Sequence, residues 1–243
     1  EKQSEYKRIC FQVVNSKDIF KTLPESTAKI RQSAPQAKIA ITIRTYKPSD
    51  VEAIFKAGAD EVGLSIDAVS PDQFSKIKGG NLKTYKDFIL NISGKYPGRI
   101  ATHLIVGMGE TEKEMVDIIK ELHEHKVIIA LFAFTPVRGA KLEFDKAPSM
   151  ANYRRIQIAL HLVRNNLNYD FKYNDQGQVL DFGYEKEELL ELLKNSNVFE
   201  TSGCTDCNRP YYNERAGDKD LYNNPDQVEE DKFVKMLETI YEY

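Results

Sequence analysis

The stretch RIATHLIVGMGETEKEMVDII, residues 99–119, contains the repeating unit of this chain. Residues 99–107 are apolar nearly throughout, as in a strand that is buried on both faces. A Gly-Met-Gly-Glu turn follows, and Thr111 and Glu114 have the spacing of a capping box at the start of a helix. The helix has one apolar stripe, formed by Met115, Ile118, Ile119 and Leu122. The stretch therefore predicts a buried strand followed at once by an amphipathic helix.

The same strand–helix unit recurs along the chain. Further apolar runs occupy residues 8–15, 38–45, 61–69 and 127–135, and helical patterns separate them. Helix-start signals are Ser49 with Glu52, Ser70 before Pro71, and Ser149 at the start of a helix over about 149–166. A weaker sixth unit is the run 178–183, followed by a helix over residues 185–195.

This alternation predicts an α/β fold with parallel strands and right-handed crossovers. We expect a partial (β/α)6 TIM-type barrel. A doubly wound open sheet is the alternative, but no Gly-x-Gly-x-x-Gly motif follows the first strand. The chain begins without Met and runs directly into a strand, so we expect the first βα unit of the barrel to precede Glu1.

The pattern changes after Asn197. Residues 198–225 are irregular and rich in Gly, Asn, Asp and Tyr, and a last helix is expected over about 226–241. We therefore divide the chain into a barrel, residues 1–197, and a cysteine-bearing C-terminal extension, residues 198–243, packed on the barrel.

Composition excludes several classes of protein. The net charge is −3 and no basic stripe is present, so we expect no nucleic-acid partner. No apolar run approaches the roughly 18 residues that span a bilayer, and no signal peptide is visible, so we expect no membrane association. Three cysteines in 243 residues do not make a disulfide scaffold, and the reducing cytoplasm is the expected compartment.

Polar residues cluster where the strands end, which is where barrels of this kind place their chemistry. Asp67 ends an apolar strand, where its carboxylate either caps the next turn or binds a ligand hydroxyl. The turn from Gly107 to Glu110 either admits a ligand close to the backbone or is a plain connection between strand and helix. The remaining strand ends carry Asn15 and Ser16, Arg44 and Thr45, and residues 135–138.

The cysteines form a second candidate site. Cys204 and Cys207 make a Cys-x-x-Cys pair, and Cys10 lies in the first strand. If the C-terminal loop folds back beside that strand, the three thiols suit an iron–sulfur cluster with one labile position. A zinc site, a redox pair and inert thiols are the alternatives, although zinc lacks a second ligand pair and the residues after Cys207 do not open an amphipathic helix.

Four stretches resemble a known family: GADEVGLSIDAVSPDQF (58–74), ATHLIVGMGETEKEMVDII (101–119), LFAFTPVRGAKLE (131–143) and TSGCTDCNRPYYNE (201–214). The first three resemble the barrel of biotin synthase-type radical S-adenosylmethionine (SAM) enzymes. With the fourth, the chain is most similar to the two-component lipoyl synthases of archaea and anaerobic bacteria.

The resemblance implies a chemistry. A [4Fe–4S] cluster cleaves SAM to a radical that abstracts hydrogen, and an auxiliary iron–sulfur cluster supplies sulfur to an octanoyl chain on a lipoyl carrier domain. The enzyme would thus be a sulfurtransferase of lipoate biosynthesis. Its implied partners are the octanoylated carrier domain, a paralogous second lipoyl synthase component, and an electron donor such as ferredoxin or flavodoxin.

The resemblance also implies roles for individual residues. Ser65 and Asp67 match positions that bind the ribose hydroxyls, and Ile105, Gly107 and Glu110 match a motif around the adenosine. Residues 134–137, with Thr135 and Val137, match a segment beside the adenine. Gln12 or Asn15 replaces the usual glycine-rich site for the methionine amino group. Cys10, Cys204 and Cys207 would hold the auxiliary cluster, with Ser202 or His103 as a fourth ligand. Arg209 and Arg215 face this cluster, the carrier domain or solvent.

The sequence also departs from the family. The Cys-x-x-x-Cys-x-x-Cys motif that holds the SAM cluster is absent, so the chain as given is not expected to cleave SAM. His103 replaces a usual glycine. Three rival functions stay open: a biotin synthase-like or other radical SAM reaction, a non-catalytic zinc-binding barrel subunit, and an ordinary metabolic barrel without a metal.

Overall fold

The computed structural model describes residues 6–16, 18–204, 207 and 220–243. Within these ranges, no helix is both long enough and apolar enough to cross a membrane. The described elements, in chain order, are β1 (Arg8–Gln12), α1 (Ile19–Ser33), β2 (Lys38–Ile43), α2 (Pro48–Lys56), β3 (Glu61–Leu64), α3 (Pro71–Ile77), α4 (Leu82–Lys95), β4 (Ile100–Val106), α5 (Glu112–Glu124), β5 (Ile128–Ala133), α6 (Met150–Arg164), β6 (Lys172–Tyr173), β7 (Val179–Asp181), α7 (Lys186–Leu193), α8 (Glu230–Glu238) and a 3₁₀ helix (Thr239–Tyr241).

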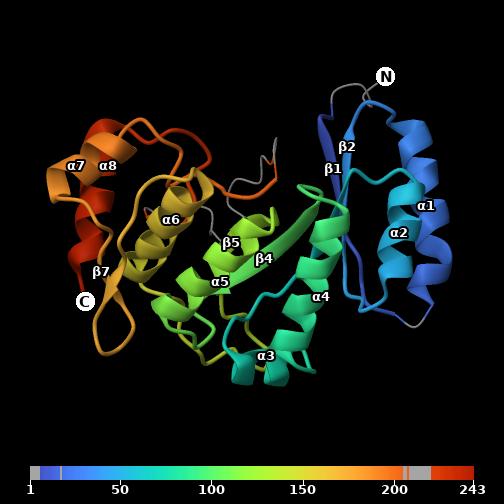
Figure 1. The fold of residues 1–243 in the computed structure, drawn as a ribbon, viewed down its shortest axis with the longest axis horizontal. Helices are drawn as coiled ribbons and strands as arrows, with labels where there is room; N and C mark the ends of the chain where they lie inside the picture. The colour runs from blue at the N-terminus through green and yellow to red at the C-terminus, as the bar shows by residue number, and fades with distance from the viewer. Residues whose placement is uncertain (1–5, 17, 205–206, 208–219) are drawn as a thin grey trace.

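Five parallel strands form one curled sheet in the order β1-β2-β3-β4-β5. Because the strand order never reverses, right-handed crossovers place all the connecting helices on one face, as in a barrel and unlike a doubly wound sheet. Figure 1 shows α1 and α2 beside β1 and β2, and α4 and α5 beside the later strands. The expected partial TIM-type barrel is therefore confirmed.

The predicted starts of two helices are fixed by hydrogen bonds between a side chain and the backbone. Thr111 and Glu114 form the predicted capping box of α5, and the Ser149 hydroxyl accepts a hydrogen bond from the Asn152 N–H at the start of α6. The apolar stripe of α5 is buried in the core, as predicted. The chain therefore forms these helices for the reasons visible in its sequence.

The predicted capping box of Ser49 and Glu52 is wrong. Helix α2 begins at Pro48, so Ser49 lies inside its first turn. The polar residue at the helix start is Thr45, whose hydroxyl accepts from the Lys47 N–H at 3.0 Å and donates to Asp50 at 2.5 Å. Proline at the first helical position decides this start, because its ring fixes φ for the helix and needs no donor.

The run 178–183 is not a sixth strand of the barrel. In the described chain β7 pairs antiparallel with β6 in a separate two-stranded sheet. The Val179 N–H donates to the Glu112 carboxylate at 2.7 Å, which attaches β7 to the start of α5. The following helix, α7, forms as expected over Lys186–Leu193.

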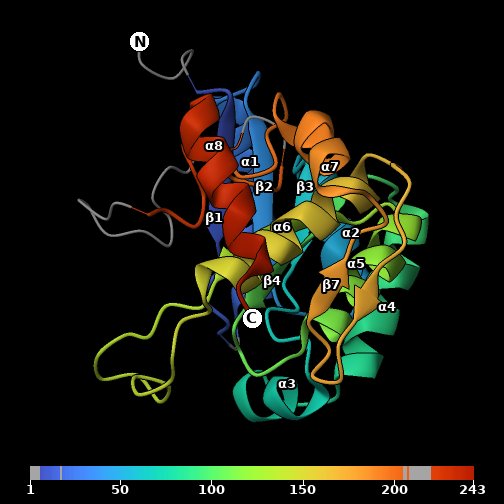
Figure 2. The same ribbon diagram turned by 90° about the vertical axis from the view of Figure 1, so that its left-hand side faces the viewer.

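Two buried arginines of α6 join the C-terminal residues to the barrel. Arg154 donates to the carbonyls of Leu221 and Tyr222, and Arg155 donates to the carbonyls of Ile240 and Glu242. Apolar residues of α8 belong to the same core cluster as the strands. Figure 2 shows α8 crossing in front of α6 at an angle, and the 3₁₀ helix after α8 packs against α6.

Candidate functional site

One cavity of about 540 Å³ lies at the carboxyl ends of the parallel strands, where the sequence predicts the chemistry. Each of the five parallel strands or its following loop contributes to its lining. Six of the predicted ligand-binding residues meet there: Gln12, Asn15, Ser65, Asp67, Ile105 and Thr135. The rest of the lining is Val13, Thr42, Ile43, Arg44, Lys78, His103, Met108, Phe132, Ala133 and Phe134.

Asp67 lies just after β3, and backbone hydrogen bonds and an ion pair fix its position. Its backbone has φ +62°, an uncommon value for a non-glycine residue that Asp tolerates better than most. The Asp67 N–H donates to the His103 carbonyl, and the Asp67 carbonyl accepts from the Ile105 N–H, each at 2.8 Å. The carboxylate forms an ion pair with Lys78 inside the cavity wall. Asp67 therefore faces the cavity and does not cap α3, which begins at Pro71.

Ser65 and His103 form a polar pair on the neighbouring wall. The Ser65 hydroxyl and His103 Nδ1 lie 2.9 Å apart and are hydrogen-bonded. The His103 ring also meets the edge of Phe132, with ring centroids 5.0 Å apart. The residue that departs from the family pattern is thus part of the cavity wall, between a hydroxyl and an aromatic ring.

Gly107 and Glu110 form the turn beside the cavity. The Glu110 carboxylate accepts from the N–H groups of Gly107, at 2.6 Å, and Met108, at 2.9 Å. Burial raises the pKa of Glu110, although these backbone hydrogen bonds oppose the rise. Neither residue lines the cavity, so they position Ile105 and Met108, which do.

Val137 also lies outside the cavity lining, and the residue is 61% exposed.

Lys78 is a cavity residue that sequence reasoning missed. It lies one residue beyond α3, and no local pattern distinguishes it from the chain's other lysines. It joins the cavity lining because its side chain extends from the end of α3 to the Asp67 carboxylate.

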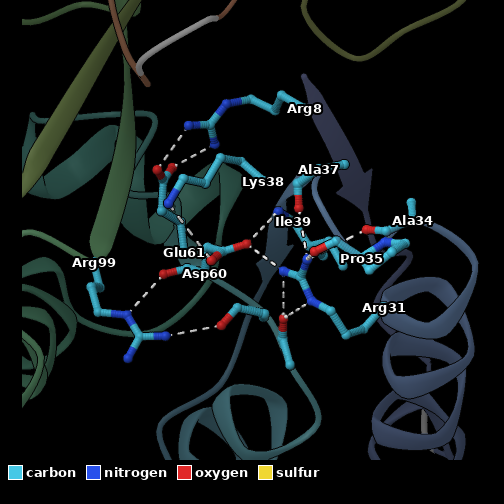
Figure 3. Close-up of polar contacts among 12 residues, drawn as sticks. Arg8, Arg31, Ala34, Pro35, Ala37, Lys38, Ile39, Asp60, Glu61 and Arg99 are labelled. Atoms are coloured by element: carbon cyan, nitrogen blue, oxygen red, sulfur yellow. Dashed lines mark hydrogen bonds and ion pairs between the residues drawn. The ribbon is translucent and has the colours of Figure 1, made fainter. Parts of the chain in front are cut away.

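None of the three cysteines lines this cavity; Cys10 belongs to β1, and Cys204 lies near it. Burial raises the pKa of the Cys204 thiol to about 12, and its hydrogen bond to Glu61 and the nearby Cys10 add to the rise. Glu61 in turn accepts two hydrogen bonds from Arg8, at 2.8 and 2.9 Å. Figure 3 shows this ion pair beside a second polar cluster around Asp60. Cys204 thus lies near the first strand, as the cluster hypothesis requires.

The described residues do not complete a metal site. Among them, no three His, Cys, Asp or Glu side chains are placed to hold one metal ion. The Cys204 thiol keeps its proton in its present surroundings, whereas a cluster takes thiolates. The family resemblance implies either of two residues as the fourth ligand of the cluster. Ser202 accepts a hydrogen bond from the Leu131 N–H at 2.9 Å, and His103 lines the cavity. Arg209 and Arg215 lie outside the described residues, so their placement stays a prediction.

Comparison with known proteins gives partial matches. No family model matches the chain. Over 93 residues, 38% of its length, the chain is 28% identical to a GTP 3',8-cyclase of Limosilactobacillus fermentum, and this match covers 28% of the cyclase. The match agrees with the radical SAM superfamily that the strand-end motifs resemble, but it does not single out the lipoyl synthases.

Two solved structures are also similar in part. One is TYW1 with a lysine-pyruvate adduct bound, at TM-score 0.45 and 15% identity, covering 71% of this chain and 55% of that one. The other is hydroxymethylglutaryl-CoA lyase from Pseudomonas aeruginosa, at TM-score 0.43 and 15% identity, covering 58% and 47%.

Proposed function

We propose that the cavity binds S-adenosylmethionine and that the chain is the barrel of a radical SAM enzyme. One observation carries this proposal: six residues expected to contact SAM, far apart in sequence, line a single cavity at the carboxyl ends of the strands. The partial match to a GTP 3',8-cyclase supports the superfamily. In such an enzyme, the SAM-bound cluster supplies a carbon radical.

The cavity suits a nucleoside in size and lining. Its volume lies within the roughly 300–1,000 Å³ of small-molecule sites. Apolar side chains suited to a purine ring come from the ends of β4 and β5, namely Ile105, Phe132 and Phe134. The Asp67 carboxylate offers acceptors for ribose hydroxyls, and Lys78 holds it in place.

Within this superfamily we propose the lipoyl synthase reaction, sulfur insertion into an octanoyl chain on a carrier domain. The C-terminal Cys-x-x-Cys motif supports it, as does the loop that brings Cys204 toward Cys10. Cys10, Cys204 and Cys207 would bind the sulfur-donating cluster, and for this Cys204 must lose its proton. The carrier domain, a second synthase component, a ferredoxin or flavodoxin, and a cytoplasmic location belong to the same proposal.

Calorimetry with S-adenosylhomocysteine tests the binding proposal. We expect Asp67→Asn to weaken binding at least tenfold, because a charged acceptor to the ribose is lost. Asp87→Asn is the matched control, since Asp87 also pairs with a lysine, Lys83, but on the exposed face of α4. An unmodified chain that binds no adenosyl compound would contradict the proposal.

Two measurements test the narrower reaction. After anaerobic reconstitution, Cys204→Ala should lose iron and sulfide; a variant that keeps both contradicts the cluster assignment, and zinc without sulfide favours the zinc-binding subunit. Activity of the complete enzyme on an octanoylated peptide, compared with dethiobiotin, then separates lipoyl synthase from biotin synthase chemistry.

A further inference from the structure

Arg44 is a cation of the cavity wall that has no counter-ion among the described residues. It follows β2 and lines the cavity. In the described chain, no carboxylate lies within ion-pair distance of its guanidinium. Its polar partners are neutral: Nη2 donates to the Gly79 carbonyl at 2.7 Å and lies 3.4 Å from the Tyr46 hydroxyl.

The other charged groups of the described lining balance each other. Lys78 pairs with Asp67, and both side chains are about four-fifths buried. The remaining lining residues bear no carboxylate. The described cavity wall therefore has one guanidinium charge without an acidic partner. An anionic ligand would supply that partner.

Arg44 is also fixed in position before any ligand arrives. Its guanidinium carbon lies 5.7 Å from the ring centroid of Phe74 and 5.6 Å from that of Tyr85, and both rings are fully buried. The Gly79 carbonyl holds one edge of the group, in a turn where Gly79 has φ +70°. Stacking and one hydrogen bond leave the donors Nε and Nη1 for a ligand, and a planar fork of donors suits carboxylate or phosphate.

We propose that Arg44 binds a carboxylate or phosphate group of the molecule that occupies the cavity. This proposal deepens the proposed function, on which it rests for one of its two possible sources. The anion is either the amino-acid carboxylate of SAM or an acidic group on the second substrate. The second source would argue against a neutral octanoyl amide as that substrate.

Calorimetry on the whole chain at low ionic strength tests this, with wild type, Arg44→Gln and Arg44→Lys. The ligands are S-adenosylhomocysteine, 5'-methylthioadenosine, which lacks the amino-acid group, and inorganic phosphate. Arg99→Gln is the matched control: Arg99 stacks on Phe55, at 4.2 Å, and donates to two backbone carbonyls, but it lies outside the cavity. Circular dichroism checks that each variant is folded.

If the anion is the SAM carboxylate, Arg44→Gln weakens S-adenosylhomocysteine about tenfold or more and leaves 5'-methylthioadenosine within twofold. Arg44→Lys recovers part of the loss, because it keeps the charge without the fork. If the anion belongs to the second substrate, Arg44→Gln abolishes phosphate binding and leaves both nucleosides unchanged.

The failures are distinguishable. Equal binding of all three ligands by wild type and Arg44→Gln overturns the inference and leaves the proposed function standing. Phosphate binding that depends on Arg44, in a chain that binds neither nucleoside, upholds the inference and overturns the proposed function. A loss equally large in Arg99→Gln also overturns the inference, because it assigns the effect to general stability.

Discussion

Arg155 connects four parts of the chain from a buried position on α6. Its side chain and that of Glu112 are each only 1% exposed. Nε and Nη2 donate to the Glu112 carboxylate at 2.7–2.9 Å, and Nη1 donates to the carbonyls of Ile240 and Glu242 at 2.8 Å. Glu112 also accepts from the Val179 N–H, so α5, α6, β7 and the C-terminal residues meet at one ion pair.

Replacing Arg155 by Met should therefore be costly. The change leaves Glu112 buried with only two neutral donors, the Asn152 amide at 2.9 Å and the Val179 N–H at 2.7 Å. Removing one partner of a buried pair typically costs about 3–5 kcal/mol. Two backbone carbonyls at the C-terminus also lose their donor. We expect a loss of about 4 kcal/mol, which is a large part of the roughly 5–15 kcal/mol that stabilises a protein.

Urea unfolding followed by circular dichroism measures this loss. Lys113→Met is the matched control, since Lys113 pairs with Asp117 on the same helix, α5, with both side chains more than half exposed; it should cost under about 1 kcal/mol. The double variant with Glu112→Gln should lose less than the sum of the single variants, because the second change removes the stranded charge. An Arg155→Met protein within about 1 kcal/mol of wild type would refute the reasoning.

Three further predictions follow from single residues. Cys204, with a pKa raised to about 12, should react with iodoacetamide at pH 8 more slowly than the exposed Cys10, and equal rates by mass spectrometry would contradict its burial. The pKa of Glu110 is raised in the folded state, so its contribution to stability is lost as pH rises above 4.5. Between pH 4 and pH 7 the free energy of unfolding of wild type should therefore fall relative to that of Glu110→Gln. A difference between the two proteins that stays constant over this range would contradict this. Gly107 has φ +96°, and a Cβ there would lie 2.7 Å from Pro148 Cδ, so Gly107→Ala should cost about 1–3 kcal/mol; an unchanged melting temperature would rule this out.

The sequence predicts the parallel part of the fold well because its signals are local. Each strand is a continuous apolar run, and α5 has both its cap and its stripe within 12 residues of sequence, 111–122. The run 178–183 gives a wrong prediction, a sixth barrel strand, because its apolar character reflects a different contact. Val179 is buried against a carboxylate 67 residues away, and no local pattern shows that contact.

The candidate site, like the fold, is predictable from the sequence only where the signal is local. The rule that barrel chemistry lies at strand ends is enough to predict Asp67, Arg44 and Asn15 as cavity residues, whereas Ser65 is predicted only by the family resemblance. It cannot predict Lys78, because that contact depends on how the turn after α3 folds. It also gives no distinction between Ile105, which faces the cavity, and Glu110, whose carboxylate is used by the backbone of its own turn.

The register of the sheet relates the thiols to the cavity. Cys10 pairs with Ala40, and Ala40 pairs with Glu61, so Cys10 lies in the same row as the residue that contacts Cys204. The next row on the same face contains Gln12 and Thr42, which line the cavity. Two residues of strand span about 7 Å.

Small residues lie at these two levels. On the face shared by Cys10 and the cavity, alternation along the strands places Ala40, Gly63 and Ala101. Gly203 packs closely against β5, where an added Cβ would lie 2.9 Å from Ala130 Cβ. Because Cys204 follows at once, the glycine lets its thiol approach Glu61 beneath the cavity. Cys10 and Cys204 therefore lie near one carboxylate, Glu61, within one row of the residues that line the cavity, which is why a cysteine in the first strand and one at position 204 belong to one proposal.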